Sequence, residues 1–218
     1  MKDFLRNNSL SITFFVLFIV AILAQVHFGH AEYNKDLQEQ SVEAVSLAEY
    51  LTTGHFVEST FENWESEFLQ MALFVLFTIF LRQKGSSESK GFDGPEEEDR
   101  EPDAKRKDAP WPVRKGGVIL LIYKHSLTIS LLALFLISFV LHFYGSLADE
   151  NTMRRIKGEA IETTSQYIAD SRFWFESFQN WQSEFLSVFA IVVLSIYLRQ
   201  QGSSQSKPVD APHYETGE

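Results

Sequence analysis

The chain has 218 residues, a formal net charge of -10 and no cysteine. The lack of cysteine excludes a disulfide scaffold, a thiolate zinc site and a cysteine nucleophile. The negative balance argues against nucleic-acid binding, because no basic face is concentrated enough to offset phosphate repulsion. Hydrophobic residues make up 45% of the chain, and most of them gather in four blocks with most of the charge between them.

The four apolar blocks predict membrane-spanning helices. Residues 9–28 carry no charge, and at about 1.5 Å per residue they can cross a hydrocarbon core of about 30 Å. Residues 126–144 are similar, whereas the two even-numbered blocks are shorter and must borrow length from the residues before them. We therefore expect transmembrane helices at about 9–28, 61–81, 120–144 and 178–198.

Two other interpretations of these blocks stay open. The blocks could be buried helices of a soluble bundle, although an uncharged stretch without a polar face disfavours that. The first block could be a signal peptide, since Lys2 and Arg6 precede it and small residues follow at 29–31. Its length and the return of the same pattern in mid-chain favour retention.

The two halves of the chain align at a constant offset of 117 residues. Residues 56–90 and 173–207 share 18 identities in 35 positions without gaps. Such a match indicates an internal repeat, each copy being one helical hairpin. We assign repeat 1 to residues 1–90, a charged linker to 91–116, repeat 2 to 117–207 and a polar tail to 208–218. Because each hairpin crosses twice, both copies insert the same way round, as parallel rather than inverted repeats.

Positive charge predicts the orientation of these hairpins. Most lysines and arginines lie in the linker, near the termini or just beyond the even-numbered helices, whereas residues 29–67 contain one lysine and nine acidic residues. Both termini and the linker are therefore expected in the cytoplasm. The linker, rich in Ser, Pro and charge, should be disordered; its charge runs could bind a partner or anionic lipid.

The loops between the paired helices are expected to contain amphipathic helices outside the cytoplasm. Apolar residues recur near the helical period at Leu37, Val45, Ala48 and Leu51 in the first loop. A second stripe follows Met153 in the second loop. These helices could be membrane-surface elements, a lid, or plain connectors that pack on the other repeat. The predicted fold class is therefore an all-α membrane protein with four transmembrane helices, arranged as two tandem, parallel-repeat hairpins with amphipathic extracytoplasmic helices.

The motif F-x-N-W-x-S-E-F-L occurs in both repeats and supplies the best candidate site. Asn63 and Glu67 share a helix face, as do Asn180 and Glu184. A carboxylate below the membrane surface is costly unless it is paired, hydrated or protonated. If the pseudo-symmetry brings the two glutamates together, they could hold a proton or a cation. Alternatively, each could reach outward to the interface.

Other polar residues near the predicted membrane boundaries have structural interpretations too. His142 could pair with Glu67, or bond to the backbone or interfacial water. Trp64 and Trp181 suit the headgroup belt, and Arg82 and Arg199 could reach phosphate headgroups. We therefore treat these two tryptophans and two arginines as interface anchors. The remaining histidines lack metal-ligand spacing, and the sequence contains no nucleotide-binding or hydrolase motif. We expect no metal, no cofactor and no catalytic residue.

The motifs W-x-S-E-F-L and L-R-Q-x-G-S-x-x-S-K, each present twice, resemble a family of small bacterial integral-membrane proteins classed only as a domain of unknown function. The resemblance covers nearly the whole chain. It implies a bacterial cytoplasmic (inner) membrane location and brings no activity, substrate or site residues.

The sequence favours a non-enzymatic structural or interaction protein of the cell envelope. Its expected partners are the lipid bilayer, a second copy of the chain, or a protein bound through the linker or the extracytoplasmic helices. The alternative is a small proton- or cation-linked transporter or channel, oligomeric and dependent on Glu67 and Glu184.

Overall fold

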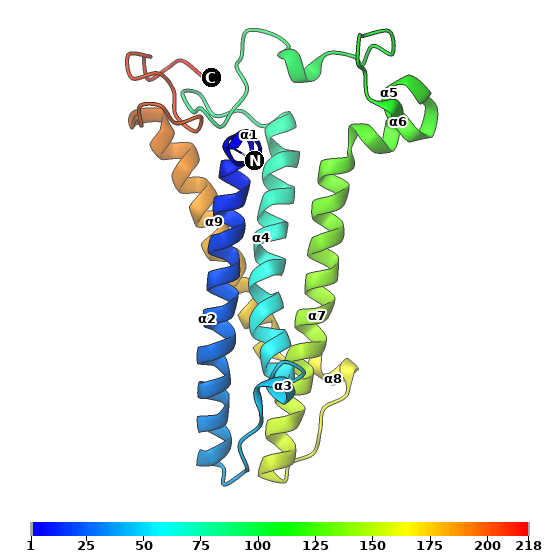
Figure 1. Ribbon diagram of the computed structural model, residues 1–218, viewed down its shortest axis with the longest axis vertical. Helices are drawn as coiled ribbons and strands as arrows, with labels where there is room; N and C mark the ends of the chain where they lie inside the picture. Colours follow the sequence, from blue (N-terminus) through cyan, green and yellow to red (C-terminus); the bar gives the residue numbers. More distant parts are fainter. Residues whose placement is uncertain (1, 218) are drawn as a thin grey trace. The chain divides into compact units, whose positions relative to one another are not determined.

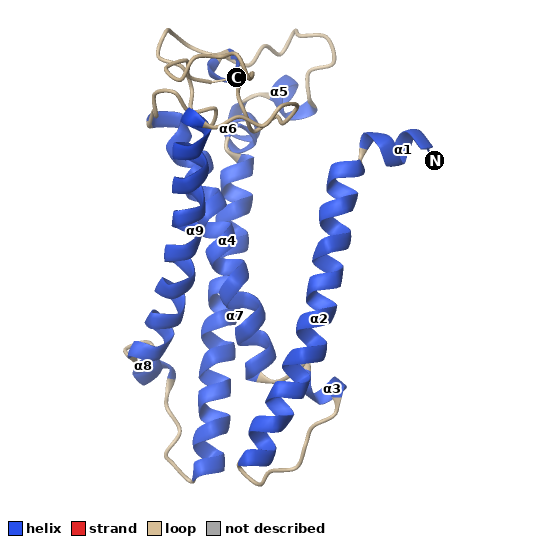
Figure 2. Ribbon diagram, turned by 90° about the vertical axis from the view of Figure 1, so that its left-hand side faces the viewer, coloured by secondary structure: helices blue, strands red, loops and turns tan. Residues whose placement is uncertain are grey.

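A computed structural model describes residues 2–217, and these contain helices and loops but no β-strand (Figures 1 and 2). The contacts divide them into two compact units. Unit 1 comprises residues 2–61 and 140–173, and unit 2 comprises 62–139 and 174–217. The α-helices are α1 (Lys2–Asn7), α2 (Ser9–Glu39), α3 (Leu47–Tyr50), α4 (Gly54–Phe80), α5 (Trp111–Lys115), α6 (Gly117–Lys124), α7 (Ser126–Lys157), α8 (Thr164–Tyr167) and α9 (Ser171–Tyr197), with a 3₁₀ turn at Glu97–Asp99.

Two of these helices, α2 and α7, are long and apolar enough to cross a membrane. In the most apolar 18-residue window of α2 no residue is buried, and in that of α7 22% of the residues are buried. Large side chains such as Phe14, Phe15 and Leu127 are more than half exposed. Exposed apolar surface on this scale is unusual for a soluble protein and suggests membrane association.

Short helices precede both candidate spans, and each is separated from its span by one residue. Asn8 separates α1 from α2, and His125 separates α6 from α7. Both separating residues leave helical geometry, with φ and ψ of -122° and 15° at Asn8 and of -115° and 10° at His125. The helix predicted at 120–144 is therefore divided at His125. Neither break lies at a proline or glycine, so the breaks could not be predicted from the sequence.

The long helices extend further into the connecting segments than predicted. Helix α2 ends with the hydrogen-bond pattern of a Schellman motif, in which Val42 N donates to Leu37 O and Ser41 N donates to Gln38 O. Ser41 lies in the left-handed region, with a φ of 59°. Helix α7 ends in the same way, and Gly158, which occupies the equivalent position, has a φ of 73°.

These turns correct the expectation of amphipathic helices in the loops. The apolar stripe that begins at Leu37 belongs partly to α2, and the turn at Ser41 interrupts it before α3. In the second loop the turn at Gly158 separates Met153 from α8 in the same way. Each loop therefore holds a single helical turn. We call residues 40–53 the first connector and residues 158–170 the second connector.

Each connector is fixed by two sets of side-chain hydrogen bonds. An asparagine on the preceding helix holds both backbone groups of one connector residue: Asn34 bonds Val45 N at 2.7 Å and Val45 O at 3.0 Å. Asn151 bonds Glu162 N and O at the same two distances. Capping boxes then start α3 (Ser46 with Glu49) and α8 (Thr163 with Gln166).

The core of unit 1 forms where the first connector meets its helices. Tyr50 is fully buried. The centroid of its ring lies 5.6 to 5.8 Å from those of Tyr33, His55 and Phe56, and the rings of Tyr33 and His55 lie 5.2 Å apart. Gly29 makes room for Tyr50, because a Cβ there would lie 2.3 Å from the Tyr50 hydroxyl. Helix α4 begins close to α7, where a Cβ on Gly54 would lie 2.3 Å from Asp149 N. These glycines permit contacts that a larger residue would block.

Unit 2 contains the linker and the tail. The linker, predicted to be disordered, includes the 3₁₀ turn and α5. The tail contacts the start of the linker, since Gly217 N donates to Ser86 O at 3.1 Å and Gly85 N donates to the Thr216 hydroxyl at 2.9 Å. Lys207 is buried, and its ammonium group donates to the carbonyls of Pro212, His213 and Glu215. The tail therefore folds around a lysine amine.

Candidate functional site

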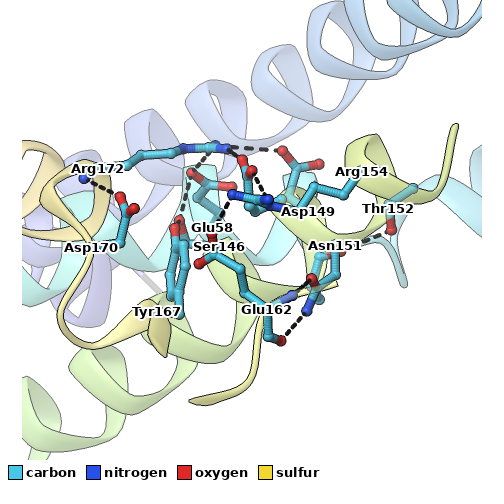
Figure 3. A network of polar contacts seen from close by, with 12 residues as sticks. Glu58, Ser146, Asp149, Asn151, Thr152, Arg154, Glu162, Tyr167, Asp170 and Arg172 are labelled. Atoms are coloured by element: carbon cyan, nitrogen blue, oxygen red, sulfur yellow. Dashed lines mark hydrogen bonds and ion pairs between the residues drawn. The ribbon is translucent and has the colours of Figure 1, made fainter. Parts of the chain in front are cut away.

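A network of polar side chains, several of them buried, lies in unit 1, where the second connector meets α4, α7 and α9 (Figure 3). At its centre is Arg172 from α9. Its guanidinium contacts Glu58 Oε1 at 2.9 Å, Glu150 Oε2 at 2.6 Å and Asp149 Oδ2 at 3.6 Å. The Glu58 and Asp149 side chains are only 10% and 9% exposed. Buried carboxylates are tolerable only when they are paired, so Arg172 is the residue that permits their burial.

A chain of hydroxyl groups links the same site to α8. Ser146 Oγ donates to Glu58 Oε1 at 3.0 Å and also contacts the Tyr167 hydroxyl. A serine hydroxyl has one hydrogen, so Tyr167 must donate to Ser146 if Ser146 donates to Glu58. Both Ser146 and Tyr167 are fully buried. This chain joins α8, α7 and α4 through three consecutive polar groups.

A second arginine extends the network along α7. Arg154 pairs with Glu150 at 2.7 Å and with Glu162 of the second connector, and Glu159 lies 3.9 Å away. Glu150 thus accepts from both arginines. We call Glu58, Ser146, Asp149, Glu150, Arg154, Glu159, Glu162, Tyr167 and Arg172 the ionic clasp.

The ion pairs and hydrogen bonds of the ionic clasp join helices to one another. Its arginines are engaged by carboxylates and its hydroxyls by one another, so their hydrogen-bonding capacity is used within the protein. It contains five carboxylates and two guanidinium groups, and Asp149 Oδ1 is buried without a hydrogen-bond partner among the described residues. No group of three or more histidine and acidic side chains within residues 2–217 is arranged to hold a metal ion.

The ionic clasp was not foreseen from the sequence. His142 was the one candidate site residue placed close to it, and the structure buries that side chain completely against Phe173, with ring centroids 5.1 Å apart. The suggested pairing of His142 with Glu67 stays a prediction. A signal for the clasp did exist, because charged residues cluster between 149 and 172 and alternate in sign. Their partner Glu58 is distant in sequence, so pairing could not be deduced.

In unit 2 the structure brings together the two glutamates of the repeated motif. The carboxyl groups of Glu67 and Glu184 lie close enough to interact electrostatically. Glu184 is half-buried and Glu67 is exposed. Two neighbouring carboxyl groups repel each other when both are ionised. The pair is therefore a place where one proton can be shared.

The asparagines of the motif accept hydrogen bonds from serine side chains through their backbone carbonyls. The Asn63 carbonyl accepts from Ser66 Oγ and the Asn180 carbonyl from Ser183 Oγ, both at 2.8 Å. These bonds stay within one helical turn of α4 and of α9. They account for the serine in both copies of the motif without involving a ligand.

Glu65 is a buried residue of the motif that was not predicted to be a site residue. It is fully buried, and its Oε1 accepts from the Trp181 indole nitrogen at 3.0 Å. Trp181, predicted to be an interface anchor together with Trp64, thus has a carboxylate partner inside unit 2. Glu65 lies seven residues before Ala72, which is also buried, so helical spacing could have placed it on the inner face.

Arg82 and Arg199 bond to the carbonyls at the ends of their helices. Arg82 Nη1 donates to the carbonyls of Thr78, Ile79 and Leu81, and Arg199 Nη1 donates to the equivalent carbonyls of Ser195, Ile196 and Leu198. The last carbonyls of a helix lack partners within it, so these arginines cap α4 and α9. This role uses the same side chains that were predicted to reach headgroups, and that prediction remains untested.

The comparisons with known proteins give one match. No curated protein matches the chain, and no solved structure does. A family model described as "Domain of unknown function (DUF6766)" matches residues 1–218. The match extends over both copies of the repeated motif and over the ionic clasp. The chain therefore belongs to the DUF6766 family.

Proposed function

We propose that the protein is a non-enzymatic, multi-pass membrane protein that acts through contacts made by its connectors. Helices α2, α4, α7 and α9 would span the membrane as two tandem hairpins inserted in the same direction. The termini and linker would lie in the cytoplasm and the connectors outside it. The inner membrane of a bacterium is the proposed location.

Matching geometry in the two halves supports the tandem arrangement. Helices α3 and α8 begin and end 117 residues apart, as do α4 and α9. The asparagine bonds, the capping boxes and the arginine caps recur at the same offset. Independent segments would have no physical reason to agree at this level of detail.

The observation that carries the interaction role is the apolar surface of the connectors. Leu47 and Leu51 of the first connector are 47% and 40% exposed, and Ile161 and Ile168 of the second are 53% and 42% exposed. These residues lie outside the proposed spans, so the acyl chains of lipids do not account for their exposure. An exposed apolar residue in such a position is suited to contact another protein.

The test places a photo-reactive benzoylphenylalanine at Leu47 or Ile161 in the full chain in intact cells. Discrete cross-linked protein bands are expected at both positions. The matched control places the same group at Phe14, which is also exposed but lies in α2, where lipid should be the neighbour and no band should form. Connector positions that form no band while the protein is correctly inserted would contradict the interaction role.

Insertion itself can be measured with single cysteines, because the natural chain has none. Cysteine at Glu43 or Glu159 should react with a membrane-impermeant maleimide in intact cells. Cysteine at Glu98 or Asp210 should react only after the membrane is opened. The reverse pattern, or equal labelling at all four positions, would contradict the proposed topology.

A second candidate function is favoured by the proximity of the Glu67 and Glu184 carboxyl groups. A shared proton within a proposed membrane segment is a feature of proton-linked transport. Proton flux in proteoliposomes that is lost in the Glu67→Gln/Glu184→Gln variant would establish this function. Flux equal to that of protein-free vesicles, from correctly inserted protein, would exclude it and leave the pair as a packing feature.

A further inference from the structure

The paired helices α5 and α6 carry a surface that neither the ionic clasp nor the connectors involve. Both belong to unit 2 and precede α7 directly (Figure 1). Their large apolar side chains are exposed: Trp111 61%, Val118 71%, Leu121 59% and Ile122 54%. Exposed tryptophan and aliphatic residues on short helices are typical of elements that lie in a membrane interface.

Basic residues border this apolar surface. Arg114 and Lys115 in the last turn of α5 are exposed and form no ion pair with any carboxylate in residues 2–217. Lys124, at the end of α6, contacts Glu101 at 3.2 Å, but that carboxylate is 89% exposed. An ion pair with such an exposed partner is weak, so a competing anion could replace Glu101.

The length of α7 explains why α6 is left at the boundary. Residues 126–144 contain no charge, and nineteen residues extend about 28 Å, which nearly matches a hydrocarbon core of about 30 Å. The apolar residues of α6 are therefore not needed to complete the span. The break at His125 frees α6 from the direction of α7 and lets it lie in the plane of the interface.

The equivalent element of the first repeat lacks this combination. Helix α1 also exposes apolar side chains, namely Phe4 and Leu5. Its Arg6, however, lies 4.0 Å from Asp3 on the same helix, so its charge is partly compensated internally. Among the basic side chains that the structure describes in these two elements, Arg114 and Lys115 are the ones without a carboxylate partner.

We propose that residues 111–124 form a docking surface for anionic phospholipids of the membrane that the protein spans, with phosphate groups bound at Arg114, Lys115 and Lys124. The apolar side chains of Trp111 and α6 would enter the interface beside them. This inference rests on the proposed insertion of α7. Each lysine or arginine near an anionic bilayer contributes about 1 kcal/mol.

The test measures which lipids lie beside Trp111. Full-length protein is reconstituted in vesicles containing the same mole fraction of either brominated phosphatidylglycerol or brominated phosphatidylcholine. Bromine quenches nearby indoles, and subtracting the signal of Trp111→Phe isolates Trp111 from the other tryptophans. Phosphatidylglycerol should be favoured over phosphatidylcholine at Trp111 by about 30- to 150-fold, as expected for two to three basic residues.

Arg114→Gln/Lys115→Gln should remove most of this enrichment and leave quenching by phosphatidylcholine in place. Arg155→Gln/Lys157→Gln, two exposed basic residues at the other end of α7, is the matched control and should change nothing. Equal quenching of the wild type by both lipids would overturn the proposal. Trp111 that neither lipid quenches would overturn it too, provided the cysteine labelling shows α7 inserted. Failed labelling would instead refute the proposed topology.

Discussion

The first and second connectors are built on the same backbone plan but are anchored by different chemistry. Both follow a Schellman turn, both are held by an asparagine and both begin a helical turn with a capping box. In the first, Tyr50 is buried among aromatic rings and against Gly29. In the second, Tyr167 also packs on the rings of Phe143 and Phe173, but its hydroxyl bonds to Ser146 within the ionic clasp.

The difference separates two roles that side chains play in this fold. Residues present in both connectors determine the path of the backbone. Residues that differ determine what the connector is attached to. Ser146 stands where Gly29 stands in the first repeat, and Arg172 stands where His55 stands. Exchanging a glycine for a hydroxyl and an imidazole for a guanidinium adds an ionic network to an aromatic anchor that both connectors keep.

The largest effect is expected from removing the charge that holds the second connector. Arg172→Met leaves the carboxylates of Glu58, Asp149 and Glu150 facing one another. We expect a loss of about 2 to 3 kcal/mol in unfolding free energy, below the full penalty for a buried pair because Arg172 is 36% exposed. His55→Met, the equivalent change in the first repeat, should cost about half as much. Thermal unfolding in detergent compares them, and equal losses would refute the distinction.

The next effect tests the fit of Tyr50 against Gly29. Gly29→Ala forces a Cβ against the Tyr50 hydroxyl and should cost about 1 to 2 kcal/mol. In the Tyr50→Phe background the nearest ring atom would be 3.2 Å away, so the same substitution should cost less. A double-mutant cycle measures this coupling. Additive losses would show that the hydroxyl is not the obstacle.

A smaller effect tests what the connectors share. Asn34→Ala and Asn151→Ala each remove two hydrogen bonds to a connector residue. Each should lower the unfolding free energy by about 1 to 2 kcal/mol, with the smaller loss at Asn34, because His30 Nε2 also contacts Val45 O at 2.8 Å. A much larger loss from one would mean that the shared bonds matter in only one connector.

The smallest effect separates the two capping boxes by pH. Hydrogen bonds from the Ser46 hydroxyl and then from its backbone N–H lower the pKa of Glu49 from its usual 4.5. A lowered folded-state pKa stabilises the box above the unfolded value, and this contribution is lost as the pH falls through the folded value. Carbon NMR should show Glu49 titrating below 4.5, and Ser46→Ala should raise its midpoint. Gln166 has no charge to titrate, so the capping box of α8 should be insensitive over this range.

The long helices could be predicted from the sequence because each apolar block runs without a charged residue. The ends of the helices could not. Ser41 adopts a positive φ, which is rare for serine, and the breaks at Asn8 and His125 involve residues that also occur within helices. Tertiary contacts and the bonds of the Schellman turn decide these positions, and neither is visible in hydrophobic periodicity.

The candidate site divides in the same way. The approach of Glu67 to Glu184 could be anticipated from the repeat, since equivalent positions on equivalent helices can meet. Glu65 and Trp181 form a bond that the repeat does not reproduce, because Gln182 stands at the position equivalent to Glu65. The ionic clasp joins Glu58 to Arg172 across 114 positions. Pairs of this kind depend on packing, which one sequence does not reveal.

The enclosure of Lys207 has a consequence for its reactivity. An ammonium group has three hydrogens, and three carbonyls of the tail accept from it, so none remains for water. Burial also lowers the pKa of this amine, but a nucleophile must leave its acceptors before it can react. Acylation of Lys207 would therefore proceed only when the tail opens, whereas Lys90, at the equivalent position in the first repeat, is held by the single carboxylate of Asp99. The ratio of acylation rates at these two lysines would measure how often the tail dissociates from the Lys207 ammonium group.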